Sequence, residues 1–276
     1  MAWDKSTNKR ESFVIVTPTL NSGTMLDETS RSVVENLKEG DEYIIVDGGS
    51  TDGSIERVQK NLPKSVRFLR DSGGGMYDAI ATGFEQSEKP IMAWLNASDI
   101  YLRNALNHVR DAFAKTNAEL LYFDNLYISE KSQVIQRSRG NVWNVMASIR
   151  AGWTPLQDGC FWTRDAYNRC GKISCKYKHA GDYDYFLRAF QKSEVKYIPD
   201  IVSCFRRHSG QLSSEISKYK AEKELIREHE SNSKLNFVTV GIARIGLTLR
   251  AKTKNGQIKS NLLGKDARYL RAGNGL

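Results

Sequence analysis

The first 115 residues alternate short, continuously apolar runs with segments in which apolar residues recur every three or four positions. A continuous apolar run predicts a strand buried on both faces, whereas the wider spacing predicts an amphipathic helix. The predicted strands are residues 12–17, 43–46, 66–69 and 91–95. The predicted helices are residues 25–38, 54–61, 76–86 and 102–115. Because single helices separate consecutive buried strands, the pattern predicts a doubly wound α/β fold with a mainly parallel sheet.

The pattern is less regular after residue 115. The predicted strands there are residues 120–123, 132–139, 159–163, 195–198 and 201–205. A short helix is expected after residue 163, followed by helices at 184–191 and 214–229. A turn joins the first two of these strands, which favours antiparallel pairing, so we expect the sheet to be mixed.

Composition narrows the protein class without suggesting a function. Of the 276 residues, 40% are hydrophobic and 26% are charged, which is ordinary for a globular protein with one large domain. No apolar run of about 18 residues predicts a membrane span, and the N-terminus has no apolar signal-peptide core. The four cysteines show no C-x-x-C spacing, so we expect reduced cytosolic thiols instead of a zinc site or disulfides.

Basic residues are concentrated at the C-terminal end of the chain. The net charge is +9, and residues 234–276 contain Asp266 as their single acid. The basic residues there are Lys234, Arg244, Arg250, Lys252, Lys254, Lys259, Lys265, Arg268 and Arg271. Residues 235–249 are apolar but too short and glycine-interrupted to span a bilayer. We therefore expect a basic helical extension that lies on a membrane surface. The alternatives are a helix packed on the body, a dimer contact, or binding to nucleic acid, which we do not expect as a partner.

Small polar residues follow each of the first four predicted strands. The four stretches are residues 17–21, 47–53, 71–75 and 96–99. Ligands of open parallel sheets bind at the carboxyl ends of the strands, which these stretches occupy. Neither G-x-x-x-x-G-K-[ST] nor G-x-G-x-x-G is present, so a P-loop and a dinucleotide-binding turn are not expected. Carboxylates without a compensating base suggest a divalent cation that arrives with a nucleotide diphosphate.

Five motifs in order resemble the family-two glycosyltransferases. They are TPTLN (17–21), IIVDGGSTDGS (44–54), GMYDAIATG (75–83), WLNASDIY (94–101) and GDYDYFLR (181–188). The similarity covers residues 12 to about 215 and is greatest to bacterial transferases of surface-polysaccharide assembly. It implies a single GT-A-type domain whose mixed, mainly parallel sheet is flanked by helices.

The resemblance implies a donor site in the first half of the domain. The residues expected to bind the nucleotide or donor sugar there are Thr17, Pro18, Thr19, Asn21, Asp47, Gly48, Gly49 and Asp78. Asp47 could instead form a turn, and Asp78 could instead complement a helix dipole. Asp52 is expected to cap the following helix. The related transferases usually have a basic residue where this chain has Gly74, which removes a phosphate contact.

The resemblance also implies a metal motif, which this chain has in reduced form. Asn96 and Ser98 are expected near the donor, and Ser98 stands where the family has an aspartate. Asp99 is expected to bind Mn²⁺ or Mg²⁺, either weakly or as a cation that turnover does not require. The alternative is that Asp99 only caps a helix. In the loop after the last strand, His208 is expected to bind the metal or a phosphate, and Arg206 the diphosphate. A structural or solvated histidine is the alternative for His208.

The second half of the domain should hold the acceptor and a catalytic base. In the family an acidic residue that opens a helix accepts the acceptor proton, which implies Asp182, with Asp184 as second choice. Helix capping is the alternative for both. Gln157 and Asp158 are expected to contact the acceptor, at a place where the subgroup often has His-Gln and this chain has Leu-Gln.

The sequence thus predicts a glycosyltransferase domain in residues 1–233 and the basic extension in 234–276. Residues 12–115 would form the nucleotide-sugar half and residues 116–233 the acceptor half. The expected reaction moves a sugar from a nucleotide-diphosphate donor, preferably a UDP-sugar, to a glycan or polyprenyl-linked acceptor, with inversion. The expected location is the cytoplasmic face of the plasma membrane. A catalytically weak or inactive nucleotide-sugar-binding or glycan-binding module of the same fold is the alternative, and the oligomeric state is left open.

Overall fold

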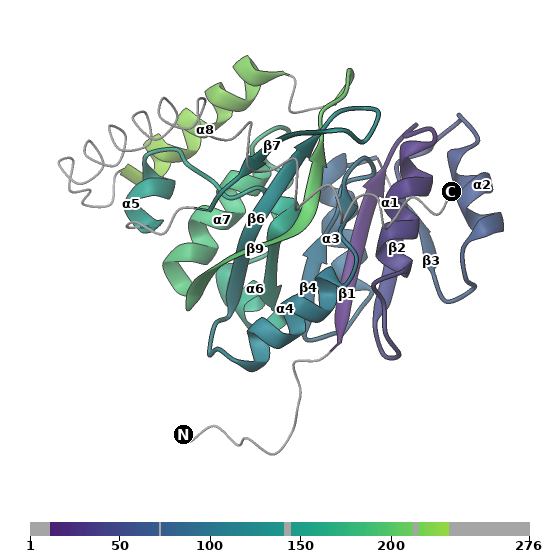
Figure 1. The fold of residues 1–276 in the computed structure, drawn as a ribbon. Helices are drawn as coiled ribbons and strands as arrows, with labels where there is room; N and C mark the ends of the chain where they lie inside the picture. Colours follow the sequence, from purple (N-terminus) through teal and green to yellow (C-terminus); the bar gives the residue numbers. More distant parts are fainter. Residues whose placement is uncertain (1–11, 72, 141–144, 212–214, 232–276) are drawn as a thin grey trace.

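The computed structural model describes residues 12–71, 73–140, 145–211 and 215–231. They form one mixed nine-stranded sheet flanked by helices, which confirms the predicted fold class (Figure 1). The strands are β1 Phe13–Thr19, β2 Glu42–Asp47, β3 Arg67–Arg70, β4 Ile91–Trp94, β5 Ile100–Tyr101, β6 Leu120–Ile128, β7 Val134–Ser138, β8 Cys160–Thr163 and β9 Val195–Arg206. The helices are α1 Met25–Val34, α2 Ser54–Asn61, α3 Met76–Glu85, α4 Ala105–Ala114, α5 Val145–Arg150, α6 Arg164–Cys170, α7 Gly181–Lys192 and α8 Ile216–Ser231, with a 3₁₀ turn η1 at Gln157–Gly159.

The N-terminal strands form the parallel part of the sheet, in the order β3-β2-β1-β4. The predicted strand boundary at Pro18 is wrong, because β1 continues through Pro18 to Thr19. Beyond Val16, β1 pairs with β2 but no longer with β4, so the missing N–H of Pro18 costs no hydrogen bond on the β4 side. This extension carries Thr19 further along the edge at which β2 ends.

The C-terminal strands complete the same sheet in the order β4-β8-β6-β9-β5. Strand β8 is antiparallel to β4 and β6, and β7 pairs antiparallel with β6 as predicted. The predicted break at residues 199–200 is wrong, because β9 is continuous and the β6–β9 register shifts between Phe123 and Asn125 to absorb it. The two-residue strand β5, which the apolar pattern does not predict, pairs with β9.

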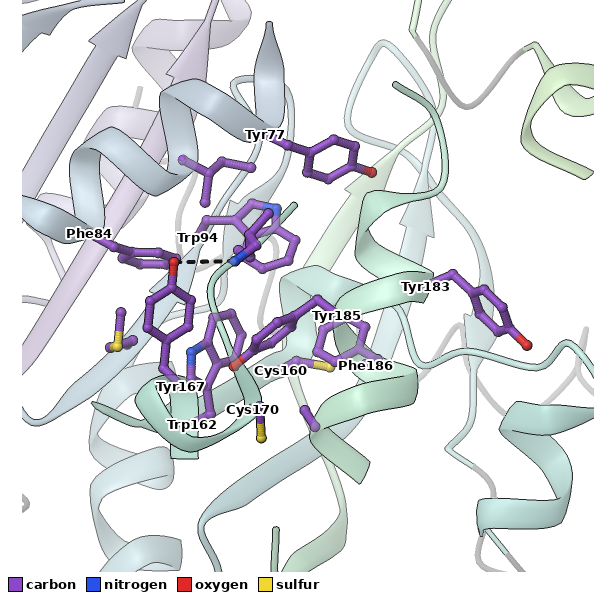
Figure 2. Packing of buried hydrophobic residues seen from close by; sticks show 14 of the residues in the cluster. Tyr77, Phe84, Trp94, Cys160, Trp162, Tyr167, Cys170, Tyr183, Tyr185 and Phe186 are labelled. Carbon is purple, nitrogen blue, oxygen red and sulfur yellow. Dashed lines mark hydrogen bonds between the residues drawn. The ribbon is translucent and has the colours of Figure 1, made fainter. Parts of the chain in front are cut away.

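Alternate residues of the central strands pack on opposite faces of the sheet. Val14 and Val16 lie in a cluster with residues of α3, α6 and α7, whereas Phe13 and Ile15 pack with α1 and α4. The first cluster contains an aromatic layer beneath α7 (Figure 2). In it the Trp94 ring stacks on Phe186 at 6.1 Å and meets Trp162 edge-on at 5.3 Å. These contacts fix α7 against the end of β4, so the start of α7 is placed by rigid packing.

Several predicted helix boundaries differ from the structure. Helix α1 ends at Val34 instead of residue 38, α4 occupies 105–114 instead of 102–115, and α7 begins at Gly181 instead of residue 184. No helix among the described residues is long and apolar enough to cross a membrane. The predicted basic extension at 234–276 lies outside the described residues.

Candidate active site

The loops that follow the parallel strands are joined at one edge of the sheet. The Gly48 N–H donates to the Thr19 carbonyl at 2.8 Å, and the Asp71 N–H donates to the Asp47 carbonyl at 2.8 Å. Three of the four loops that the strand-end rule selects are therefore in direct backbone contact.

The loop after β1 is tied to the loop after β2 by side chains. Asn21 has a positive φ of 50°, its Oδ1 accepts from the Thr51 N–H at 2.8 Å, and its own N–H donates to Ser50 Oγ at 2.9 Å. Asp52 Oδ2 accepts from the Gly23 N–H at 2.8 Å. Asp52 Oδ1 accepts from the N–H and hydroxyl of Ser54, the first residue of α2, but the N-cap itself is Gly53 and not Asp52 as predicted. The Asn21 amide oxygen thus holds the two loops together.

Asp47 is oriented by its own turn. Its Oδ1 accepts from the Ser50 N–H at 2.9 Å and from Ser50 Oγ at 2.7 Å. Thr19 is buried at the same edge, with its hydroxyl donating to Ser22. Thr17 differs from its expected position in a nucleoside site, because it is fully buried and its hydroxyl accepts from Tyr43 Oη at 3.0 Å.

Backbone shape accounts for the neighbouring glycines and proline. Gly49 has a φ of +101°, a conformation that favours glycine, and a Cβ there would lie 3.2 Å from Arg70 Nη2. A Cβ on Gly48 would meet the Thr19 carbonyl at 3.5 Å, an ordinary contact. Pro18 is buried in β1. The backbone conformation therefore requires a glycine at position 49 more than at position 48.

Asp78 lies in the first turn of α3, directly against Gly74. A Cβ at Gly74 would be 2.3 Å from Asp78 Oδ2, so a larger residue at 74 would displace this carboxylate. Asp78 Oδ1 accepts from the Cys175 thiol at 3.4 Å. Gly74, which stands where the family has a basic residue, thus leaves the space that the Asp78 carboxylate occupies.

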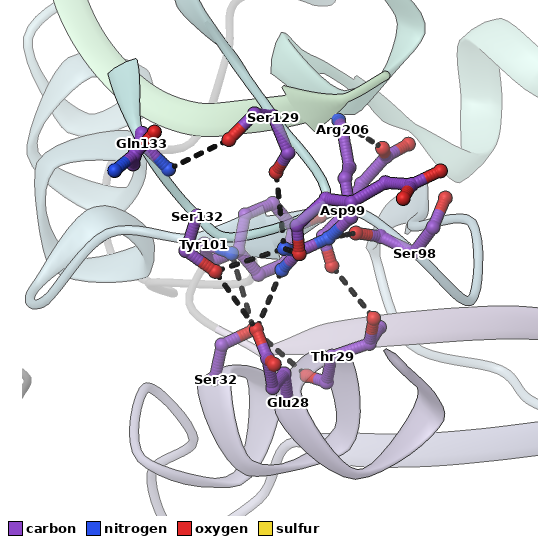
Figure 3. Close-up of polar contacts among 11 residues, drawn as sticks. Glu28, Thr29, Ser32, Ser98, Asp99, Tyr101, Ser129, Ser132, Gln133 and Arg206 are labelled. Atoms are coloured by element: carbon purple, nitrogen blue, oxygen red, sulfur yellow. Dashed lines mark hydrogen bonds and ion pairs between the residues drawn. The ribbon is translucent and has the colours of Figure 1, made fainter. Parts of the chain in front are cut away.

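Asp99 is turned into the protein (Figure 3). It is 1% exposed, its Oδ1 accepts from the Arg206 N–H at 2.9 Å, and its carbonyl accepts from Thr29 Oγ1 at 2.8 Å. Burial raises the pKa of the Asp99 carboxyl well above its ordinary value, and the neighbouring Asp158 raises it further. This carboxylate joins the end of β9 to the loop after β4.

The Arg206 side chain is hydrogen-bonded to protein groups at the same junction. It is 1% exposed, and its guanidinium donates to the carbonyls of Ser98 and Glu130 at 2.8 and 3.1 Å and to Ser132 Oγ at 2.8 Å. It also forms an ion pair with Glu28 Oε2 of α1 at 2.6 Å. The expected contact of Arg206 with a diphosphate does not agree with this placement, because its N–H groups already point at protein oxygens.

The residues after β4 do not make up a divalent-cation site. The one carboxylate of the motif, Asp99, is buried and bonded to a backbone N–H, and Ser98 offers a hydroxyl where a carboxylate is expected. The His208 Nδ1 is bonded to the neighbouring Ser209 carbonyl at 2.8 Å. Within the described ranges, no group of three or more His, Cys, Asp or Glu side chains is arranged to hold a metal.

Two buried side chains of η1 keep polar atoms without a partner among the described residues. Gln157 is 7% exposed, and both atoms of its amide lack a hydrogen bond. Asp158 is fully buried, with Oδ2 accepting from Asn125 Nδ2 at 2.9 Å and Oδ1 unpartnered. The Oδ1 of Asn96, after β4, is unpartnered too. Buried polar atoms without partners are costly, so these groups are suited to meet a polar ligand.

Asp182 opens α7 and is half-buried among hydroxyls. Its Oδ1 accepts from the Tyr183 N–H at 2.8 Å and from Tyr77 Oη at 3.4 Å, and its Oδ2 accepts from Tyr219 Oη at 3.5 Å. Burial raises its pKa, while the Tyr183 N–H and the charge of Lys223 act in the opposite direction. An elevated pKa makes a carboxylate a stronger base at neutral pH, which suits proton abstraction.

Asp184 has a structural environment instead. Its Oδ2 accepts from Arg188 Nε at 3.1 Å and Nη2 at 2.7 Å, one turn along the helix. Arg188 in turn donates to the carbonyls of Cys170 and Gly171. The second-choice base is therefore occupied in holding α7 against the end of α6.

A groove of about 630 Å³ lies elsewhere, between α4 and β9. Its lining includes Arg103, His108, Lys115, Arg137, Lys196 and Asp200. We place the site at the strand ends because the carboxylates and the unpartnered buried atoms are found there, and the groove contains none of the motif residues.

The sequence pattern did not indicate four residues that surround Asp182 or Asp158. They are Tyr77, Asn125, Tyr219 and Lys223. A signal existed for Tyr77, which belongs to the G-M-Y-D-A motif. Tyr219 and Lys223 come from a charged helix whose docking face is not visible in its composition.

Comparisons with known proteins agree on one family. A family profile described as "Glycosyl transferase family 2" matches residues 14–174. A PGL/p-HBAD biosynthesis glycosyltransferase of Mycobacterium tuberculosis is 24% identical over 235 residues, which cover 82% of this chain and 86% of that protein. An uncharacterized glycosyltransferase of Rickettsia conorii is 24% identical over 229 residues. That alignment covers 79% of this chain and spans 38% of the length of the Rickettsia protein.

Solved structures with low sequence identity share the fold. S. aureus TarS 1–349 in complex with UDP-GlcNAc has a TM-score of 0.68 at 15% identity, covering 84% of this chain and 70% of that one. The mannosyltransferase PcManGT from Pyrobaculum calidifontis, in complex with GDP-Man and Mn²⁺, has a TM-score of 0.61 at 15% identity. That match covers 85% of this chain and 67% of PcManGT.

Proposed function

Because this chain belongs to glycosyl transferase family 2, we propose that it moves a sugar from a nucleotide-diphosphate donor to a glycan or polyprenyl-linked glycan acceptor. A UDP-sugar is the favoured donor, and the reaction inverts the anomeric centre. The pathway we propose is the synthesis of a bacterial surface polysaccharide at the cytoplasmic face of the plasma membrane. Support for a nucleotide-sugar donor comes from the ligands of the structural neighbours, UDP-GlcNAc in TarS and GDP-Man in PcManGT.

The proposal rests mainly on the position of Asp182. A half-buried carboxylate with a raised pKa opens a helix that the aromatic layer fixes against the end of β4. In the proposed step the acceptor oxygen bonds to the anomeric carbon while the bond from that carbon to the diphosphate oxygen breaks. The acceptor proton passes to Asp182, and the nucleoside diphosphate leaves with the electron pair.

The donor is proposed to lie along the loops after β1, β2 and β3. The remaining oxygen of Asp47, the Gly49 backbone and the Asp78 carboxylate are the groups proposed to contact its nucleoside and sugar. Gln157, whose buried amide has no partner in the described part of the chain, is proposed to meet the acceptor or the transferred sugar. The cation binding of PcManGT is not transferred to this chain, because the residues after β4 do not fit a divalent ion.

Substitution of Asp182 tests the proposal against a binding module of the same fold. Asp182→Asn should abolish donor hydrolysis and transfer, with thermal shifts by nucleoside diphosphates unchanged. Asp184→Asn, a matched change two residues away, should retain turnover. Wild type that binds UDP-, GDP- or dTDP-sugars without ever turning them over would instead identify a binding module.

A further inference from the structure

Helix α8 docks on the body through one polar face. Its inward residues are Tyr219, Glu222, Lys223, Ile226 and Arg227, spaced three and four apart. Of these, Ile226 is the one apolar side chain that is fully buried. Figure 1 shows α8 beside α5 and α7 at one end of the molecule. The helix is therefore held by directed polar contacts more than by apolar area.

Glu222 binds the backbone immediately before α7. Its Oε2 accepts from the N–H groups of His179 and Ala180 at 2.8 Å each, and its Oε1 accepts from the Lys178 N–H at 3.2 Å. Ala180, the N-cap residue of α7, supplies no side-chain cap of its own. A carboxylate at a helix N-terminus satisfies free N–H groups and complements the helix dipole. Glu222 thus fixes from α8 the backbone that leads into α7, up to its N-cap residue Ala180.

Two cations of α8 bind the opposite kind of helix end. Lys223 Nζ donates to the Gly152 carbonyl, and Arg227 Nε donates to the Arg150 carbonyl at 2.9 Å, both at the C-terminus of α5. Positive charge is favoured there for the same electrostatic reason. Helix α8 therefore contacts the start of α7 through an acidic side chain and the end of α5 through two basic side chains.

Asp182 lies two residues after Ala180, whose N–H Glu222 binds. Tyr219 of α8 and Tyr77 of α3 donate to its two oxygens, and the Tyr77 ring packs so closely on Gly181 that a Cβ there would be 2.8 Å from it. The titratable and charged groups that face Asp182 or its turn are Tyr77, Cys160, His179, Tyr219, Glu222 and Lys223. The Lys223 Nζ lies 4.7 Å from the Tyr183 ring and 5.1 Å from the ring of Tyr219, whose hydroxyl donates to Asp182.

We propose that Glu222 and Lys223 are positioning residues for the base Asp182: Glu222 fixes the turn that presents it, and Lys223 favours its ionised form. The inference rests on the proposed function, in which Asp182 accepts the acceptor proton. It also assigns to α8 a part in the active site.

Lys223→Met tests the charge effect. Removal of the cation should raise the pKa of Asp182, so the acidic limb of the kcat/KM profile should move to higher pH. Lys220→Met, an exposed change on the same helix, should leave the profile unchanged. The pKa can be read without turnover by carboxyl ¹³C NMR, with Asp182→Asn assigning the signal. An unshifted Asp182 titration in Lys223→Met would overturn the role of Lys223.

Glu222→Gln tests the positioning effect against Glu224→Gln, an equal charge change on the exposed side. Glu222→Gln should lower kcat by ~10-fold, a partial loss of base catalysis, with the donor KM unchanged. Glu224→Gln should match wild type. Equal kcat values for both variants would overturn the role of Glu222. Absence of turnover in wild type would instead contradict the proposed function, while the NMR titration would still decide the charge effect.

Discussion

Arg206 and Arg207 are adjacent but lie in opposite environments. Arg206 is buried with its hydrogen bonds directed at protein oxygens, whereas Arg207 is exposed over the Tyr127 ring at 4.2 Å. Arg206→Met should lower the free energy of unfolding by about 3 kcal/mol, because it leaves buried carbonyls unsatisfied. Arg207→Met should cost less than about 1 kcal/mol. Urea denaturation of both variants checks this, and equal losses would contradict the structural role of Arg206.

Asp158 should make stability depend on pH in an unusual direction. Burial raises its pKa from 3.8 to about 6 in the folded protein. Between these values the folded state binds more protons than the unfolded state, so the free energy of unfolding should fall as pH rises from about 4 to about 6. Asp158→Asn should flatten that fall in urea titrations. The exposed variant Asp200→Asn should retain it, and an unchanged slope in Asp158→Asn would refute the assignment.

The altered metal motif leads to a prediction about cation removal. Because Asp99 is buried and Ser98 carries no charge, donor turnover should persist in EDTA. Ser98→Asp, which adds a carboxylate at a half-buried position, should give a Mn²⁺-dependent thermal shift with nucleoside diphosphate that wild type lacks. Loss of wild-type activity in EDTA and its recovery with Mn²⁺ would contradict this prediction.

Residue identity predicted the location of the site better than the orientation of its side chains. The rule that ligands meet strand ends selected the loops at 17–21, 47–53, 71–75 and 96–99, and the first three of them touch. The inward turn of Asp99 depends on the N–H of Arg206, more than 100 residues away in the chain. Local pattern contains no information on such a partner, and the same limit applies to Tyr219 beside Asp182.

Helix α3 packs unusually closely on the sheet. A Cβ at Gly83 would lie 2.6 Å from Val16 Cγ1, so Gly83→Ala should destabilise the protein by about 1–3 kcal/mol despite the better helix propensity of alanine. Val16→Ala makes room for the new methyl group. The double variant should therefore be more stable than the sum of the single losses predicts, and simple additivity in urea denaturation would contradict the clash.

At the scale of elements, apolar runs of four or more residues predicted strands well. The two-residue strand β5 is too short for any periodicity, and it forms only because β9 lies beside it. The sequence Pro199-Asp200 resembles a turn but lies within β9, where a shift in the β6–β9 register accommodates it. Both errors arise where pairing between distant segments overrides local preference.

At the scale of the whole molecule, charge distribution predicts where the protein binds. The basic residues beyond 233 should attract anionic lipid, so truncation after Ser233 should abolish co-sedimentation with phosphatidylglycerol vesicles. Neutral phosphatidylcholine vesicles provide the control, and added salt should weaken binding of the full chain. Equal sedimentation of truncated and full chains would remove the case for a membrane contact.

The sheet order also constrains how the chain completes its fold during synthesis. Strand β5 belongs to the first half of the chain, yet it is attached to the sheet through β9, which leaves the ribosome about a hundred residues later. Until then β5 has no partner strand, and the Asp99 carboxylate lacks the Arg206 N–H that binds it in the complete fold. The same late segment that completes the sheet thus also binds the Asp99 carboxyl, and Glu222 follows it to fix the backbone before α7. A nascent chain halted before residue 195 would contain most of the proposed donor loops. Its sheet would lack β9, and the Asp99 carboxyl would lie at the open edge.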